Sequence, residues 1–195
     1  MAFVANISND EVAALEAVQF DGQIEVVESA AALDAACDYL AREQILGFDT
    51  ETRPSFTSGV TNKVALLQLF GGEKCFLVRL NRVAMSHKLI ALLQNPSILK
   101  IGAAVQNDIV SLNALRHFKA RGFVDLQSIV GDYGIEDKSL RKISGIVLGK
   151  KVSKAQRLSN WEAKTLTPQQ MMYAATDAWV CVEIYKRLKL TKTLK

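Results

Sequence analysis

Ile45-Leu-Gly-Phe-Asp-Thr-Glu51 is an apolar run that ends in two carboxylates, and its composition predicts a β-strand. Two further strand-like runs follow along the chain, Val64-Ala-Leu-Leu-Gln-Leu-Phe70 and Cys75-Phe-Leu-Val78. The dipeptide Gly71-Gly72 lies between these two runs and is typical of a tight hairpin turn. The three runs therefore predict three consecutive strands that include an antiparallel hairpin.

Short strands and helices are predicted on both sides of these runs. Residues 24–27 alternate as a strand does, and Ser29 is a good N-cap for a helix that ends near Arg42. Later patterns predict strands over 98–101 and 123–126 and helices over 86–94, 105–118, 127–132, 139–148 and 168–190. This order predicts an α/β fold, with a mixed sheet of five or six strands and helices on both faces. Residues 1–22, with a short helix over 10–19, are expected to form an N-terminal arm, and residues 23–195 the domain itself.

Composition limits the classes to which the protein can belong. The chain has 195 residues, of which 49% are hydrophobic and 23% charged, as in one ordinary globular domain. No apolar run approaches the ~18 residues that span a bilayer, and the N-terminus has no signal-type apolar core. We therefore expect an intracellular protein without membrane contact, cytoplasmic if bacterial. Three scattered cysteines and two histidines disfavour a disulfide framework, a zinc site and a Ser-His-Asp triad, so that catalysis would depend on carboxylates.

Charge is unevenly distributed along the sequence. Residues 1–51 contain eleven acids and one base, a net charge of −10, whereas residues 52–195 carry 23 bases and nine acids, a net charge of +14. A basic stretch of this size suits a polyanion such as nucleic acid, because cationic side chains that neutralise phosphates release counterions. A solvated basic surface is the alternative.

The first candidate site residues are the two acids that end the first quoted run. In a strand, the period of two places Asp49 and Glu51 on one face and Phe48 and Thr50 on the other. Two neighbouring carboxylates repel each other, and a hard divalent cation such as Mg²⁺ or Mn²⁺ relieves that repulsion. Exposure of both acids to solvent at the end of the strand is the alternative.

Three further candidates lie on predicted helices. Asp108 is in the first turn of the helix over 105–118, where an acid can also serve simply to complement the helix dipole. Tyr173 and Asp177 are four residues apart and share a helix face that continues with apolar residues. An acid on such an inward face requires a cation or hydrogen-bond donors. With Asp49 and Glu51, these residues could hold two metal ions for attack on a phosphodiester.

The ordered set Asp49-x-Glu51, Asp108 and Tyr173-x-x-x-Asp177 resembles the DEDDy subgroup of 3′–5′ exonucleases, which have a ribonuclease-H-like fold. The flanking segments are similar to exonuclease domains of the Werner syndrome type and, more distantly, to ribonuclease D. These segments are Lys63-Val-Ala-Leu-Leu-Gln-Leu69, Lys74-Cys-Phe-Leu77, Leu158-Ser-Asn-Trp-Glu162 and Leu166-Thr-Pro-Gln-Gln-Met-Met-Tyr-Ala-Ala-Thr-Asp-Ala178. The resemblance extends over residues 24–190, nearly the whole chain.

This resemblance implies a role for each of the five residues. Asp49, Glu51 and Asp177 bind one of two divalent metal ions, and Asp49 binds the second with Asp108 nearby, through water. Tyr173 orients the attacking water, and Glu51 also contacts the 3′-terminal hydroxyl. The implied activity is metal-dependent removal of 5′-mononucleotides from the 3′ end of a DNA or RNA strand, with DNA favoured.

The segment before the last helix supplies candidate contacts for the strand. Lys154 and Arg157 are predicted to contact the nucleic acid, and a solvated surface is the alternative for both. Trp161 could stack on a base or pack at the foot of the helix. After this tryptophan, ribonuclease D usually continues Arg-Pro-Leu, whereas this chain has Ala163-Lys-Thr-Leu166, which leaves Lys164 as a possible phosphate contact.

Two other functions fit the sequence less well than an exonuclease. A catalytically silent nucleic-acid-binding protein of the same fold is disfavoured, because all five site positions carry the residue of the family. A phosphatase of the haloacid dehalogenase type needs Asp-x-Asp-x-Thr/Val, but Glu51 and Arg53 occupy the second and last of these positions. The sequence therefore favours the exonuclease.

Overall fold

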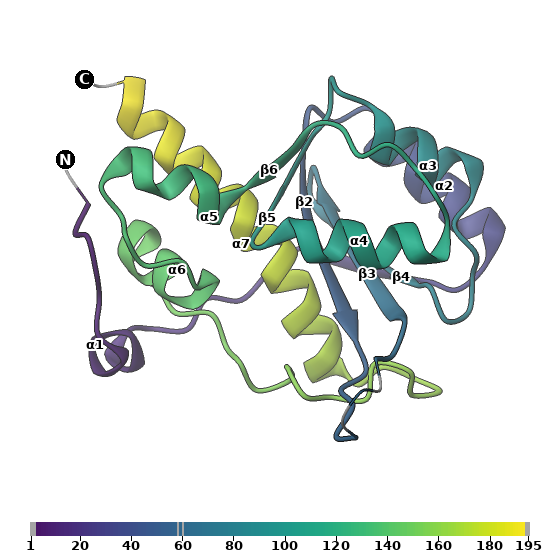
Figure 1. Ribbon diagram of the computed structural model, residues 1–195, viewed down its shortest axis with the longest axis horizontal. Coiled ribbons are helices and arrows are strands. Elements are labelled where there is room, and N and C mark those ends of the chain that lie inside the picture. Colours follow the sequence, from purple (N-terminus) through teal and green to yellow (C-terminus); the bar gives the residue numbers. More distant parts are fainter. Residues whose placement is uncertain (1–2, 58, 60, 194–195) are drawn as a thin grey trace.

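A single six-stranded mixed sheet forms the centre of the computed structural model, which describes residues 3–57, 59 and 61–193 (Figure 1). The strands are β1 (Gln23–Val27), β2 (Ile45–Thr52), β3 (Val64–Gly71), β4 (Lys74–Arg79), β5 (Leu99–Gly102) and β6 (Phe123–Asp125). Their order across the sheet is β1-β4-β3-β2-β5-β6. Strand β3 is antiparallel to both β2 and β4, and the remaining neighbours are parallel. The predicted α/β class, mixed sheet and hairpin are confirmed. Of the five or six strands predicted, the sheet has six.

Helices cover both faces of this sheet, as predicted. They are α1 (Asn9–Ala14), α2 (Ala30–Leu40), α3 (His87–Gln94), α4 (Val105–Leu115), α5 (Leu126–Ile129), the 3₁₀ helix η1 (Val130–Tyr133), α6 (Leu140–Leu148) and α7 (Pro168–Thr193). One face packs against α2, α3 and α4. The other face packs against α7, with α5 and α6 beside it (Figure 1). None of the helices in the described part of the chain is long and apolar enough to cross a membrane.

Side-chain caps set the helix boundaries that the sequence indicates. Ser29 accepts a hydrogen bond from the Ala32 backbone N–H at the start of α2. Thr167 and Gln170 bond each other's backbone N–H groups and form a capping box at the start of α7. Helix α6 ends before Gly149, whose φ of +66° belongs to the left-handed region.

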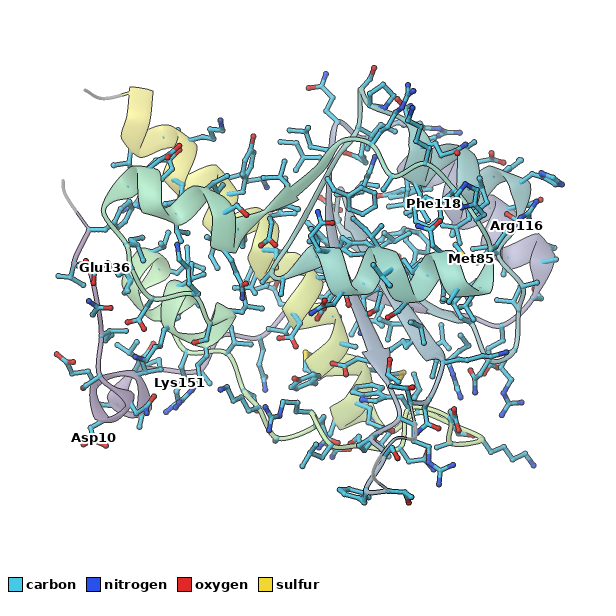
Figure 2. The ribbon with its side chains drawn as sticks, viewed as in Figure 1. Asp10, Met85, Arg116, Phe118, Glu136 and Lys151 are labelled. Atoms are coloured by element: carbon cyan, nitrogen blue, oxygen red, sulfur yellow. The ribbon has the colours of Figure 1, made fainter. Side chains whose placement is uncertain are left out.

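Three helices differ from their predicted bounds. Helix α1 ends at Ala14 instead of residue 19, because Leu15 is extended. Helix α4 ends at Leu115 instead of residue 118, because Arg116 is extended and the Asn113 side chain accepts the Phe118 N–H at 2.9 Å. Figure 2 shows Arg116 beside Met85 at this end of the molecule, and the Arg116 guanidinium donates to the Met85 carbonyl. The predicted helix over 127–132 is instead the short α5 followed by η1.

The N-terminal arm, residues 3–22, lies along α6 and the chain that follows it. The Val18 N–H donates to the Lys151 carbonyl at 3.0 Å, and the Lys151 N–H donates to the Glu16 carbonyl at 2.9 Å. Figure 2 shows Asp10, Glu136 and Lys151 at the same end of the molecule, near α1 and α6. Near the end of the arm, Phe20 is buried with its ring edge-on to Phe70 of β3 at 5.5 Å. The arm is thus attached to the helical layer that contains α7.

Candidate active site

The crossing of β2 and α7 is unusually close and brings two predicted site elements together. A Cβ atom at Gly47 of β2 would lie 2.0 Å from the carbonyl oxygen of Ala178 in α7. Only glycine permits this approach of two backbones. Because Asp49 and Asp177 lie within two residues of the crossing, both carboxylates are placed in the same space between sheet and helix.

Three predicted metal ligands meet there. Ligand oxygens of Asp49, Glu51 and Asp177 all lie within 4.8 Å of one another. The two acids of β2 share the strand face that packs on α7, as the period of two predicts. Asp177 is 6% exposed, which confirms the predicted inward face of its helix. This group offers only oxygen ligands, the type that Mg²⁺ and Mn²⁺ prefer.

Asp108 approaches β2 from the other side of the strand. It lies in the first turn of α4, and its Oδ1 accepts a hydrogen bond from the Thr50 hydroxyl at 2.5 Å. Thr50 shares its strand face with Phe48, which packs in the layer of α2, α3 and α4. Asp108 is therefore beside the group of three carboxylates and not a member of it.

Asp125, which is not among the site residues predicted from the sequence, fixes the start of α4. Asp125 at the end of β6 accepts hydrogen bonds from the backbone N–H groups of Ala104 at 3.0 Å and Gln127 at 2.9 Å. Ala104 has a φ of +60°, which is unusual for a residue with a side chain. The Asp125 carboxylate therefore holds the left-handed residue from which α4, and with it Asp108, begins.

Burial and mutual repulsion raise the pKa values of the clustered acids. The pKa of Asp49 is raised well above its usual value by burial first and then by Asp177, Glu51 and Asp108. Burial, followed by Asp177 and Asp108, raises the pKa of Glu51 to about 8. Burial also raises the pKa of Asp177 to about 7, although a hydrogen bond from Tyr173 opposes this change. A bound cation would reverse these shifts, because it favours the charged form of each carboxylate.

Orphaned polar atoms show that the site fits a hydrated metal ion. Gln68 of β3 pairs directly with Asp49 across the strands, so both side chains point to the α7 face. Gln68 is fully buried, and both polar atoms of its amide lack a hydrogen-bond partner among the described residues. The Oδ1 atom of Asp177 is buried and likewise without a partner in this part of the chain. Buried polar groups are rarely left unpaired, and a metal ion with its water ligands supplies partners for these atoms.

Tyr173 and Trp161 have different surroundings. Burial, followed by Asp177, Glu51 and Asp49, raises the pKa of Tyr173, so its phenol keeps the proton and can donate a hydrogen bond. Trp161 lies 6.0 Å from Tyr173 between ring centroids and is 0% exposed. The predicted stacking of Trp161 on a base is therefore wrong, because neither face of its indole is accessible; the alternative, packing at the foot of the helix, holds.

The predicted cationic contacts lie in the segment that connects α6 to α7. Lys154 and Arg157 are both exposed and stay candidates for contact with a strand. The Lys164 side chain is exposed too, while its carbonyl accepts a hydrogen bond from Arg82 at 3.1 Å. Arg79, fully buried, donates to the neighbouring Ala163 carbonyl. Two arginines near the end of β4 thus anchor the backbone that leads into α7.

The fold and the acidic cluster define a nuclease of the ribonuclease-H-like class, and comparison with known proteins gives the family. The 3′-5′ exonuclease family matches residues 24–193. The chain is 36% identical over 157 residues to the bifunctional 3′-5′ exonuclease/ATP-dependent helicase WRN of Mus musculus. The aligned region covers 76% of this chain and 11% of that protein. It is 27% identical over 191 residues to ribonuclease D of Haemophilus influenzae. This aligned region covers 95% of this chain and 47% of the relative.

Solved structures agree with this relationship. The EXO domain of Aedes aegypti Nibbler superimposes with a TM-score of 0.79 at 25% identity and covers 88% of this chain and 89% of that one. Escherichia coli RNase D has the same fold, with a TM-score of 0.78 at 24% identity over 86% of this chain and 44% of that one. This chain belongs to the 3′-5′ exonuclease family. It spans 11%, 25% and 52% of the length of three curated relatives that it matches.

Proposed function

We propose that this protein is a metal-dependent 3′–5′ exonuclease that releases 5′-mononucleotides from a nucleic acid strand, with DNA favoured over RNA. The observation that carries this proposal is the group formed by Asp49, Glu51 and Asp177, whose ligand oxygens lie within 4.8 Å of one another beneath α7. Membership in the 3′-5′ exonuclease family supports the reaction and its direction.

Each side chain of the site has a task in this reaction. Asp49, Glu51 and Asp177 would hold one divalent ion, and Asp108 would contribute to a second ion through water, with Mg²⁺ or Mn²⁺ as the metals. Such ions supply a nucleophilic hydroxide and stabilise the charge that develops on the phosphate. Tyr173, protonated at neutral pH, orients the attacking water by its hydroxyl. Glu51 contacts the terminal 3′-hydroxyl, and Lys154 and Arg157 hold the phosphates behind it.

The preference for DNA has two supports. Identity to the helicase-linked exonuclease WRN, at 36%, exceeds identity to ribonuclease D, at 27%. The ribonuclease D pattern after the tryptophan is also replaced by Ala163-Lys-Thr-Leu166. Discrimination between the two kinds of strand would depend on contacts to the 2′-hydroxyl.

A denaturing gel tests both parts of this proposal. A 5′-labelled oligodeoxynucleotide and an RNA of the same sequence are incubated with Mg²⁺ or Mn²⁺, with EDTA, and with the Asp49→Asn variant. We expect a ladder that shortens from the 3′ end, faster for DNA, and absent with EDTA or with the variant. Intact bands in every lane from a folded protein would sink the exonuclease proposal, and faster loss of RNA would reverse the preference.

A further inference from the structure

A cavity beside the carboxylates is built from three separate parts of the chain. Its volume is about 330 Å³, within the range of small-ligand sites. Val18 and Gln19 of the N-terminal arm form the first wall, and the N-terminal half of α7 forms the third. The second wall is formed by Val152, Ser153, Ala155 and Gln156. In Figure 1 the segment between α6 and α7 runs beside this half of α7. The arm wall precedes residue 24, where the match to the exonuclease family begins.

The cavity borders the candidate active site at one side chain, Tyr173. Tyr173 lines the cavity and is also hydrogen-bonded to Asp177, one of the three clustered carboxylates. A group that occupies the cavity therefore lies one side chain away from the proposed reaction centre. This position links the cavity to the end of the strand that is cut.

The lining combines apolar surface with amide groups. Apolar contact comes from Val18, Val152, Ala155, Pro168 and Met172, and glutamines from all three walls, Gln19, Gln156 and Gln169, add donors and acceptors. None of the described residues that line the cavity carries a carboxylate. This combination suits a flat heteroaromatic ring with a polar edge, and exposed Lys154 and Arg157 in the adjoining segment suit the phosphates attached to it.

The arm wall is fixed in place before any ligand binds. The Phe20 N–H donates to the Thr176 hydroxyl of α7 at 3.1 Å, which ties the arm directly to the third wall. The backbone bonds between the arm and Lys151 tie it to the second wall. A cavity with fixed walls loses little conformational entropy when it binds a ligand.

We propose that this cavity binds one base among the last three nucleotides of the 3′ end, and that the N-terminal arm is thereby part of the substrate site. The proposal rests on the proposed function for the end of the strand that is bound. It assigns to Gln19, Gln156 and Gln169 the contacts to the edge of the base, and to Val18 and Met172 contacts to its apolar surface.

Binding to strands that lack single bases tests this proposal. Fluorescein-labelled oligodeoxynucleotides carry one abasic residue at each of the last six positions in turn, and anisotropy gives Kd in Ca²⁺ with the strand confirmed intact on a gel. For the wild-type protein we expect Kd to rise about tenfold at one of the last three positions, because the cavity loses its contacts to one base there. Ala155→Trp fills the cavity and should raise Kd about tenfold for the complete strand but add no further loss at that position.

Matched variants separate this result from general damage. Ala35→Trp places the same ring on an exposed position of α2, on the other face of the sheet, and should bind as the wild type does. Gln19→Ala, an exposed change that keeps the arm backbone, should raise Kd severalfold and covers the case in which Ala155→Trp does not fold. A flat abasic scan, or unchanged binding by folded Ala155→Trp and Gln19→Ala, would overturn the base pocket. Because these are binding measurements, absence of cleavage by the wild type would count against the proposed function and not against the pocket.

Discussion

Glu51 and Asp177 show at the scale of single residues why the clustered carboxylates suit a cation. Burial, with the neighbouring acids, raises the pKa of Glu51 to about 8, and burial raises the pKa of Asp177 to about 7. Between the ordinary pKa of a carboxyl, about 4, and these raised values, the folded protein binds more protons than the unfolded chain. Its stability therefore falls as the pH rises through this interval.

The first prediction follows from this loss of stability with rising pH. We expect the melting temperature of the metal-free protein to fall between about pH 5 and about pH 8. At the upper pH, Mn²⁺ at about a hundredfold excess over its Kd should raise the melting temperature by about 5 °C or more. Differential scanning fluorimetry measures both changes, and Asp177→Asn, which removes one charge, should reduce both. A metal-free melting temperature that climbs over this interval would contradict the account.

Gln68 provides a second test at the same scale. Its amide is fully buried beside Asp49, and both polar atoms are unpaired among the described residues. Such unpaired burial lowers the free energy of unfolding by about 1–3 kcal/mol. Gln68→Leu should therefore leave the metal-free protein at least as stable, yet weaken Mn²⁺ binding about tenfold, because the amide orders the ligands or their waters. Calorimetric titration with Mn²⁺ gives the affinity. Gln23→Leu, at an exposed position of β1, is the control, and equal Mn²⁺ affinity in all three proteins would rule out this role for Gln68.

At the scale of elements, the crossing of β2 and α7 creates the site. We predict that Gly47→Ala, whose Cβ would meet the Ala178 carbonyl at 2.0 Å, destabilises the protein by about 1–3 kcal/mol and weakens Mn²⁺ binding. Chemical denaturation and calorimetry measure the two effects. Gly131→Ala is the matched control, since its Cβ would meet only the Lys138 Nζ at 3.9 Å. A Gly47→Ala protein with unchanged stability and metal affinity would show that the close crossing is not required.

Most elements could be predicted from the sequence because their signals are local. Ser29 and the Thr167–Gln170 pair mark helix starts, and Gly149 marks a helix end, each by chemistry confined to one turn. The end of α4 could not be predicted in this way, because it depends on a hydrogen bond from Phe118 to Asn113 in an irregular turn.

The site could be predicted only as far as strand and helix periodicity reach. The periods of two and 3.6 place Asp49, Glu51 and Asp177 on inward faces. They say nothing of contacts between distant segments, so the hydrogen bond from Thr50 to Asp108 and the burial of Trp161 appear only in three dimensions. Gln68 has a signal in the sequence, because it is a polar residue within the apolar run 64–70. A neutral amide does not by itself indicate a metal site, so this signal is weaker than that of the carboxylates.

At the scale of the whole molecule, the charge of residues 52–195 should govern binding of the strand. Arg157 is exposed in the segment that leads to α7. We predict that Arg157→Glu weakens binding of a single strand and lowers the slope of log K against log salt concentration by about 0.7, the value for one lost phosphate contact. Anisotropy titrations at several salt concentrations measure both. Arg187→Glu makes the same charge change at an exposed position near the far end of α7, and a similar loss of slope in both variants would point to a diffuse field instead of a contact.

Identification of the released product tests the central claim most directly. A single-stranded oligodeoxynucleotide is incubated with the protein and Mn²⁺, and the small molecules that appear are separated by chromatography and weighed by mass spectrometry. The site formed by Asp49, Glu51 and Asp177 predicts 5′-mononucleotides in the order of the sequence from the 3′ end, none with EDTA and none with Asp49→Asn. Release of 3′-monophosphates, or equal release without metal or with Asp49→Asn, would contradict hydrolysis by these carboxylates.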